Sequence, residues 1–160
     1  MAVDMFLVCD DLKGEAQDSV HKNSIDVLAW SWGVSNSGTT HTGGGGGAGK
    51  ANIQDISLTK WVDKASTDLI KHCCNGKHIP KMTLIVRKAG EKPLEYIKIL
   101  MEDCLISSVS TGGSGGEDRL TENVSINFAT VELEYTPQKA DGTGDAPKKI
   151  GWKIAENVMK

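Results

Sequence analysis

The sequence predicts a single, mainly β domain over residues 1–160, either an antiparallel barrel or a sandwich, that carries one short helix. Six or seven segments rich in β-branched residues alternate with turn signals, and only one segment has the pattern of a helix. Eleven of the 18 glycines lie in two stretches, residues 38–49 and 110–116, so glycine marks loops rather than strand interiors. A chain of this length can bury a core without disulfides or metal.

The first two strands are predicted over residues 2–10, AVDMFLVCD, and residues 24–35, SIDVLAWSWGVS. The second segment alternates with a period of two. Its bulky face carries Leu28, Trp30, Trp32 and Val34, and its small-residue face carries Val27, Ala29, Ser31 and Gly33. We expect the bulky face to fill the barrel and the small-residue face to lie outside it. A further strand is expected to begin near Asn52.

The one helix is predicted next, with Ser66 as N-cap, Asp68 in the first turn and Gly76 as the stop. Its apolar side carries Leu69, Ile70 and Cys73. Strands are then expected over residues 80–89, 94–110 and 121–135, since these segments are rich in β-branched residues and are bounded by turn formers.

The strand expected over residues 121–135 changes phase along its length. One phase carries Val124, Ile126 and Phe128, and the other carries Val131, Leu133 and Tyr135. Such a slip predicts a β-bulge, or a strand that passes from one sheet to another. The tail from 137 to 149 is interpreted as a linker, and IGWKIAENV after it as a last strand.

The stretch HTGGGGGAGK, His41 to Lys50, is close to the pattern of a nucleotide-binding P-loop. From Gly44 it fits G-x-x-x-x-G-K, but the next residue is Ala51, where a P-loop has a Ser or Thr that ligates magnesium. A P-loop must also leave a buried strand and open a helix, and neither flank has that pattern. We therefore expect no nucleotide site, and interpret Ser35–Lys50 as an extended glycine-rich loop.

No catalytic or metal-binding constellation emerges from the remaining residues. The run HCCNGKH contains four candidate zinc ligands, His72, Cys73, Cys74 and His78. Consecutive helical residues point in different directions, so at most two of the four could face one ion. Cys104 has no histidine tied to it as a base. We expect no enzyme activity, cofactor or metal; the enzyme alternative is nucleotide hydrolysis at the P-loop-like stretch.

Charge and hydropathy limit the partners and the compartment. Lys and Arg number 18 and Asp and Glu 21, and the net charge of −3 gives no reason to expect nucleic acid or an anionic membrane as partner. The four cysteines form no compact disulfide framework, which favours a reducing compartment. The N-terminus has no basic region before its short apolar run, and no segment is long and apolar enough to span a membrane. Export would need a dedicated machine.

Six stretches, taken in chain order, resemble the Hcp (haemolysin-coregulated protein) family, the inner-tube protein of the bacterial type VI secretion system. They are AVDMFL, IDVLAWSWGVSNSG, HTGGGGGAGK, NIQDIS, STGGSGGEDRLTENVSINFATVELEYTPQKADG and GWKIAENV. The run STGGSGGEDRLTENV is the most specific of these, and the resemblance extends over nearly the whole chain. It implies an antiparallel two-sheet β-barrel with one short α-helix at its side, close in architecture to phage tail-tube proteins.

The resemblance also implies a homo-hexameric ring that stacks into a tube inside a contractile sheath and is expelled with a spike protein. Such a subunit would be cytoplasmic before firing and then secreted without a cleaved signal peptide. The glycine-rich loop would act as an arm that contacts a neighbouring ring or the sheath. Its contact residues would be Gly43, Gly44, Gly45, Gly46, Gly47 and Lys50.

Small effector proteins are held in the ring lumen in this family, so the resemblance also predicts a lumen wall. The small-residue face at Val27, Ala29 and Ser31 has the short side chains that such a wall needs, and Ser31 matches a lumen position of the family. The alternative function is an effector-binding chaperone or receptor module in which tube building is secondary.

Overall fold

The computed structural model describes residues 2–38 and 48–160. The described residues form ten strands and one helix. In chain order they are β1 (Val3–Val8), β2 (Ile25–Ser31), β3 (Val34–Gly38), β4 (Ala48–Ile53), β5 (Ile56–Trp61), α1 (Ser66–Asn75), β6 (Ile79–Lys88), β7 (Leu94–Thr111), β8 (Thr121–Tyr135), β9 (Lys148–Lys153) and β10 (Val158–Met159). None of the helical structure in these two ranges has the length and hydropathy needed to cross a membrane.

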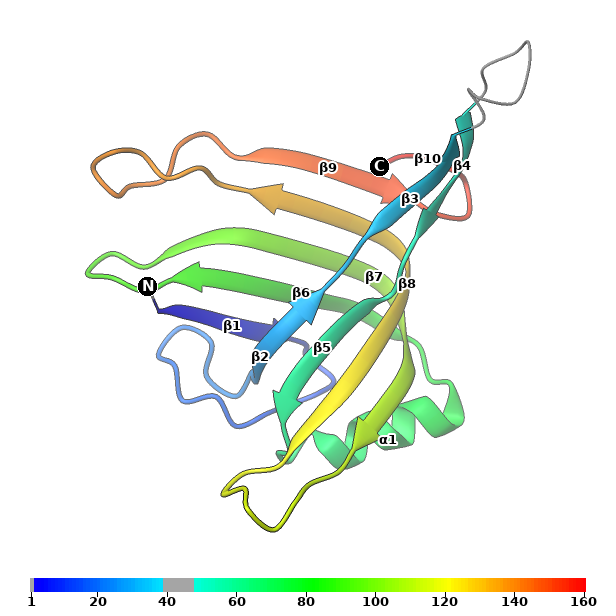
Figure 1. Cartoon of the computed structure of the whole chain (residues 1–160). Coiled ribbons are helices and arrows are strands. Elements are labelled where there is room, and N and C mark those ends of the chain that lie inside the picture. Colours follow the sequence, from blue (N-terminus) through cyan, green and yellow to red (C-terminus); the bar gives the residue numbers. More distant parts are fainter. Residues whose placement is uncertain (1, 39–47) are drawn as a thin grey trace.

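Six of the strands close into an antiparallel barrel. They follow one another in the order β8-β5-β2-β1-β6-β7, and β7 pairs with β8 to complete the ring. Figure 1 shows these strands wrapped around a common interior, with α1 beside one end. β9 and β10 extend the sheet beyond β8, whereas β3 and β4 form a separate hairpin. The predicted mainly β fold is confirmed, and the barrel is the correct one of the two architectures.

Each barrel strand contributes a fully buried aliphatic side chain to one core. From β1, β2, β5, β6, β7 and β8 respectively, these are Leu7, Ile25, Ile56, Leu84, Ile99 and Ile126. Burying one such side chain contributes about 1.5–3 kcal/mol. The core is therefore the main source of the barrel's stability.

β8 changes its partner along its length, as the phase slip in its sequence indicated. Residues 121–126 pair with β5, and residues 130–135 pair with β9. Phe128 and Val131 are both buried although they are three residues apart, so the inward phase shifts between them. One edge of the strand thus exchanges β5 for β9, while the other edge stays paired with β7 along both halves. β9 begins at Lys148, inside the segment 137–149 that was interpreted as a linker.

β2 does not keep the alternation that its sequence predicts. Its register against β5 shifts between Val27 and Ala29, which is the signature of a β-bulge. Val27 is 6% exposed and lies in the core, whereas Leu28 is 37% exposed. The predicted exposure of Val27 and the predicted burial of Leu28 are therefore wrong, because the bulge reverses the inward phase. Beyond it, Trp30 packs against the core and Ser31 is exposed.

α1 packs beside β7 and ends where the sequence predicts. Gly76 stops the helix in the left-handed conformation, with φ at 64°. The N-cap is Ala65 rather than Ser66, and Ala65 makes no side-chain capping bond. The buried helical residues are Ser66, Leu69 and His72. Ile70 is exposed, so its predicted place on the apolar side is wrong.

A buried ion pair ties the start of α1 to the barrel. Lys60 of β5 and Glu122 of β8 are opposite residues in the ladder, and only 0% and 1% of their surface is exposed. The Lys60 ammonium donates to the Glu122 carboxylate, and to Asp63 Oδ1 at 3.0 Å. The Ser66 hydroxyl donates to Glu122 at 2.6 Å. A buried charge is tolerated only when it is paired and hydrogen-bonded, so these contacts fix where the helix begins.

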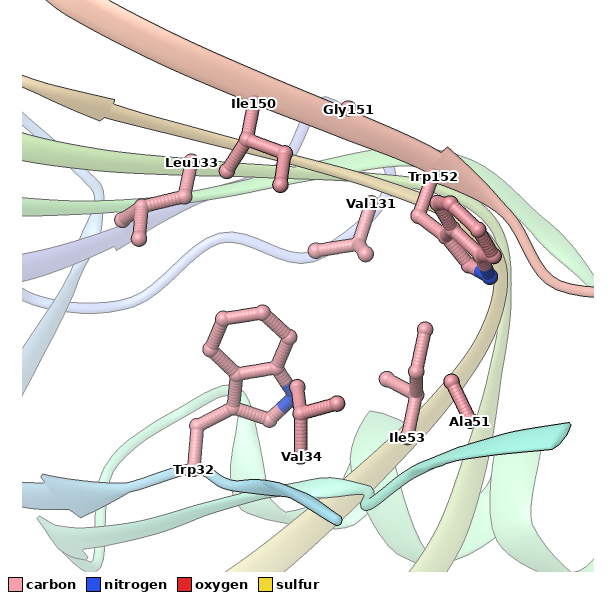
Figure 2. A pocket seen from close by; sticks show the side chains of 9 residues that line it. All are labelled: Trp32, Val34, Ala51, Ile53, Val131, Leu133, Ile150, Gly151 and Trp152. Carbon is pink, nitrogen blue, oxygen red and sulfur yellow. The ribbon is translucent and has the colours of Figure 1, made fainter. Parts of the chain in front are cut away.

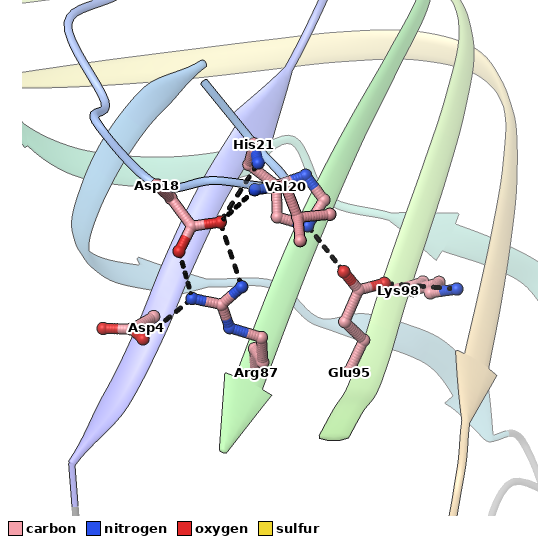
Figure 3. A network of polar contacts seen from close by, with 7 residues as sticks. All are labelled: Asp4, Asp18, Val20, His21, Arg87, Glu95 and Lys98. Atoms are coloured by element: carbon pink, nitrogen blue, oxygen red, sulfur yellow. Dashed lines mark hydrogen bonds and ion pairs between the residues drawn. The ribbon is translucent and has the colours of Figure 1, made fainter. Parts of the chain in front are cut away.

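A second polar network holds the segment between β1 and β2 against β6 (Figure 3). The Arg87 guanidinium donates to Asp18 at 2.6 and 3.1 Å, and to Asp4 at 3.1 Å. The bonds from Arg87 hold the pKa of Asp18 well below its ordinary value. The stability that this pair contributes is present above the ordinary aspartate pKa of about 3.9 and is lost as the pH falls toward the lower folded value.

Lys60→Met is expected to lower the free energy of unfolding by about 3–5 kcal/mol, because it leaves the Glu122 carboxylate buried without its cation. Urea unfolding at one fixed protein concentration measures the change. Lys98→Met is the matched control, since it removes a half-exposed lysine paired with Glu95 and should cost about 1 kcal/mol or less. Equal losses for the two variants would contradict the role of the buried pair.

Candidate functional surfaces

One face of the barrel carries short polar side chains across four adjacent strands. β2, β5, β8 and β7 lie next to one another in this order. Besides the half-exposed Leu105, which is opposite Asn127, the exposed or half-exposed residues on this side include Ala29, Ser31, Asp55, Ser57, Thr59, Ser107, Asn123, Ser125 and Asn127. These nine residues are termed the polar sheet face. A face of this kind remains hydrated, so it neither packs onto a core nor excludes a polar partner.

Side chains on the polar sheet face bond to their cross-strand neighbours. Thr59 of β5 is opposite Asn123 of β8, and its hydroxyl donates to Asn123 Oδ1 at 2.8 Å. The hydroxyls of the next pair, Ser57 and Ser125, lie 3.5 Å apart. Next to these residues a hollow of about 250 Å³ is bordered by Ala29 and Ser31, among others. The face is therefore ordered by its own contacts before any partner arrives.

Asp55 is bonded across three strands of the same face. Its Oδ2 accepts a hydrogen bond from the Ser107 hydroxyl at 2.7 Å, and its Oδ1 accepts one from the Asn127 amide at 2.9 Å. Asp55 directly precedes β5, Asn127 lies on β8 and Ser107 on β7. Both carboxylate oxygens are thus held in fixed directions by neutral donors.

Two of the three residues predicted for a lumen wall, Ala29 and Ser31, lie on the polar sheet face. The third, Val27, is in the core and contributes nothing to this surface. The residues that β5, β7 and β8 add were missed. The alternation of Ser57 and Thr59 with the apolar residues of β5 was a signal that could have revealed part of the set.

An apolar groove lies between the β3–β4 hairpin and strands β8 and β9 (Figure 2). Its volume is about 220 Å³. The apolar groove is lined by Trp32, Val34, Ala51, Ile53, Val131, Leu133, Ile150, Gly151 and Trp152. Val34 and Ile150 are 55% and 52% exposed. Clustered apolar side chains that remain open to solvent are typical of an interaction surface.

β3 and β4 flank the glycine-rich stretch, and they form a strand pair that projects from the barrel (Figure 1). β3 and β4 pair from Val34 opposite Ile53 to Gly38 opposite Ala48. Gly43, Gly44, Gly45, Gly46 and Gly47 lie outside the described residues. Lys50 is an exposed residue of β4, so the chain after the glycines continues as a strand. A P-loop would open a helix at this point, and the P-loop interpretation is therefore wrong.

The histidines and cysteines do not assemble into a site within residues 2–38 and 48–160. No group of three or more His, Cys, Asp or Glu side chains in these ranges could hold a metal ion. His72 Nδ1 lies 2.6 Å from the Asp68 carbonyl oxygen, and His78 Nδ1 lies 2.7 Å from Asp103 Oδ1. Burial raises the pKa of Cys104 to about 12, so its thiol stays protonated and is a poor nucleophile at neutral pH.

Comparison with known proteins places this barrel in one family. Residues 6–135 match the family model described as "Type VI secretion system effector, Hcp". Protein hcp1 of Pseudomonas aeruginosa is 59% identical over 161 aligned positions, which cover 99% of each chain. A solved type six secretion system protein is similar with a TM-score of 0.94 and 30% identity, over 99% of this chain and 100% of that one. Hcp1 from Salmonella typhimurium is similar with a TM-score of 0.83 and 37% identity, over 100% of both chains. The chain therefore belongs to the Hcp family of type VI secretion system proteins.

Proposed function

We propose that this protein is the structural tube subunit of a type VI secretion system. Its copies form hexameric rings, the rings stack into the expelled inner tube, and the lumen carries effectors. The observation that carries the proposal is family membership over nearly the whole chain, together with two separate candidate surfaces on the barrel. A closed ring of head-to-tail contacts needs one surface for its neighbours and a different one for the lumen.

The polar sheet face is the surface that lines the lumen in this proposal. Its side chains are short, and Asp55 alone among its nine residues is ionisable. A channel that passes varied cargo benefits from a wall that neither fills the channel nor binds every cargo through apolar contacts. Ser31 and Ala29 border the hollow on this face, which makes them the first candidates for contact with an effector.

The apolar groove is the surface that receives a second copy of the chain. Apolar side chains are enriched at the buried centre of homo-oligomer interfaces, and Val34 and Ile150 are more than half exposed in one copy alone. The groove residues and the polar sheet face have no residue in common. One copy can therefore pack into the groove while the polar sheet face stays open to the lumen.

The projecting hairpin fits the role of an arm that contacts a neighbouring ring or the sheath. Gly43 to Gly47 and Lys50 are the proposed contact residues, and Lys50 is exposed on β4. Secretion with a spike protein follows from the same role. The subunit would be made in the cytoplasm and would leave the cell through the machine without a cleaved signal peptide.

Ser31→Gln is expected to reduce retention of a co-expressed small effector of the same secretion system, because the longer side chain occupies the hollow beside Ala29. Affinity purification of the protein and quantification of the bound effector measure this. The free energy of unfolding should change by less than about 0.5 kcal/mol, as is usual for a surface substitution. Ser19→Gln, at another exposed serine, should retain the effector. Full retention by both variants would exclude Ser31 from the binding surface.

Ile150→Asp is expected to convert assembled rings into monomers, because it places a charge in the apolar groove that the second copy covers. The isolated subunit should stay folded, since Ile150 is 52% exposed in it. Native mass spectrometry measures the mass, and circular dichroism checks the fold. Val20→Asp is the control, at an exposed apolar residue outside the groove. A folded Ile150→Asp variant with the wild-type mass would show that the groove is not the contact.

A further inference from the structure

Asp55 differs from the rest of the polar sheet face in carrying a full negative charge. It is half-buried, and both of its oxygens are hydrogen-bonded, one to Ser107 and the other to Asn127. Both donors are neutral, so they orient the carboxylate without cancelling its charge. The ion pairs formed between described residues do not include Asp55.

Most other carboxylates that are buried or half-buried have a cation beside them, although the half-buried Asp26 forms no ion pair with another described residue. Glu122 is paired with Lys60, Asp18 with Arg87, and Glu95 with Lys98. Partial burial of a charge is unfavourable unless a counter-charge or donors compensate for it. At Asp55 the protein supplies two hydrogen-bond donors, but no described residue supplies a cation. A cation from a partner can therefore bind there.

The geometry at Asp55 suits a basic side chain. An ionised carboxylate has about four lone-pair positions, and the bonds from Ser107 and Asn127 use one on each oxygen. The remaining positions can accept hydrogen bonds from an ammonium or a guanidinium group. The next pair along β5 and β8, Ser57 and Ser125, has short side chains.

We propose that Asp55 selects cargo by binding a lysine or arginine side chain on the protein held against the polar sheet face. This rests on the proposed function, in which that face lines the lumen. In a symmetric ring every copy presents the same carboxylate, so cargo meets a belt of equivalent Asp55 side chains. Repeated sites of this kind favour cargo with several basic groups over cargo with one.

The test uses the assembled protein and two fluorescein-labelled peptides of equal length, one containing lysines and the other containing glutamates at the same positions. Fluorescence anisotropy measures binding of both peptides. The wild type should bind the lysine peptide more tightly than the glutamate peptide. Asp55→Asn should weaken binding of the lysine peptide by about tenfold, the loss expected for one charged hydrogen bond. Ser107→Ala should weaken it less, because the charge remains and only its orientation is lost.

Glu91→Gln is the matched control for net charge. It removes one negative charge from the exposed turn between β6 and β7, away from the polar sheet face, and should leave the affinity for the lysine peptide unchanged. Equal effects of Asp55→Asn and Glu91→Gln, or equal binding of the two peptides by the wild type, would overturn the role of Asp55. Native mass spectrometry of the same samples separates the two proposals. Rings that retain an effector through Ser31 but do not prefer the lysine peptide would refute cargo selection alone, whereas absence of rings would refute the proposed function and cargo selection with it.

Discussion

The pairing of β7 with β8 closes the barrel, and both candidate surfaces depend on it. This ladder joins the two longest strands and leaves the six barrel strands without a free edge. The first half of β8 completes the polar sheet face between β5 and β7. Its second half stays paired with β7, has β9 in place of β5 as its other neighbour, and contributes Val131 and Leu133 to the apolar groove. A single bent strand thus sets the spacing between the surface proposed for the lumen and the surface proposed for a neighbouring copy.

Charge is distributed over this scaffold in two distinct ways. Inside, Lys60 and Glu122 compensate one another and hold α1 at the end of the barrel through Ser66. On the polar sheet face, Asp55 is oriented by Ser107 and Asn127 but is not paired with a cation in the described part of the chain. The first arrangement stabilises the subunit itself. In the second arrangement the negative charge of Asp55 is available to a positively charged group of a partner.

Local signals in the sequence were enough for most of the barrel strands, for the helix stop at Gly76 and for the family, since each rests on neighbouring residues or on a contiguous run such as STGGSGGEDRLTENV. They were not enough for β3 and β4, which lie partly inside the segment Ser35–Lys50 that was interpreted as a loop. The position of Leu28 was not predictable in this way, because the bulge is set by the register of β2 against β5, which is distant in sequence. Asp55 was missed for the same reason. Its partners Ser107 and Asn127 lie 52 and 72 residues away, and only the closed barrel brings them together.

The central claim is that the polar sheet face lines the hole of a closed ring. An electron cryo-microscopy reconstruction of the purified protein tests it most directly, because the outward side of β2, β5, β7 and β8 can be located relative to the ring axis. A six-fold ring is expected in which Ser31 and Asp55 face the hole and a neighbouring subunit covers the apolar groove. A monomer, or a ring in which the polar sheet face is buried between subunits or lies on the outer surface, would contradict it.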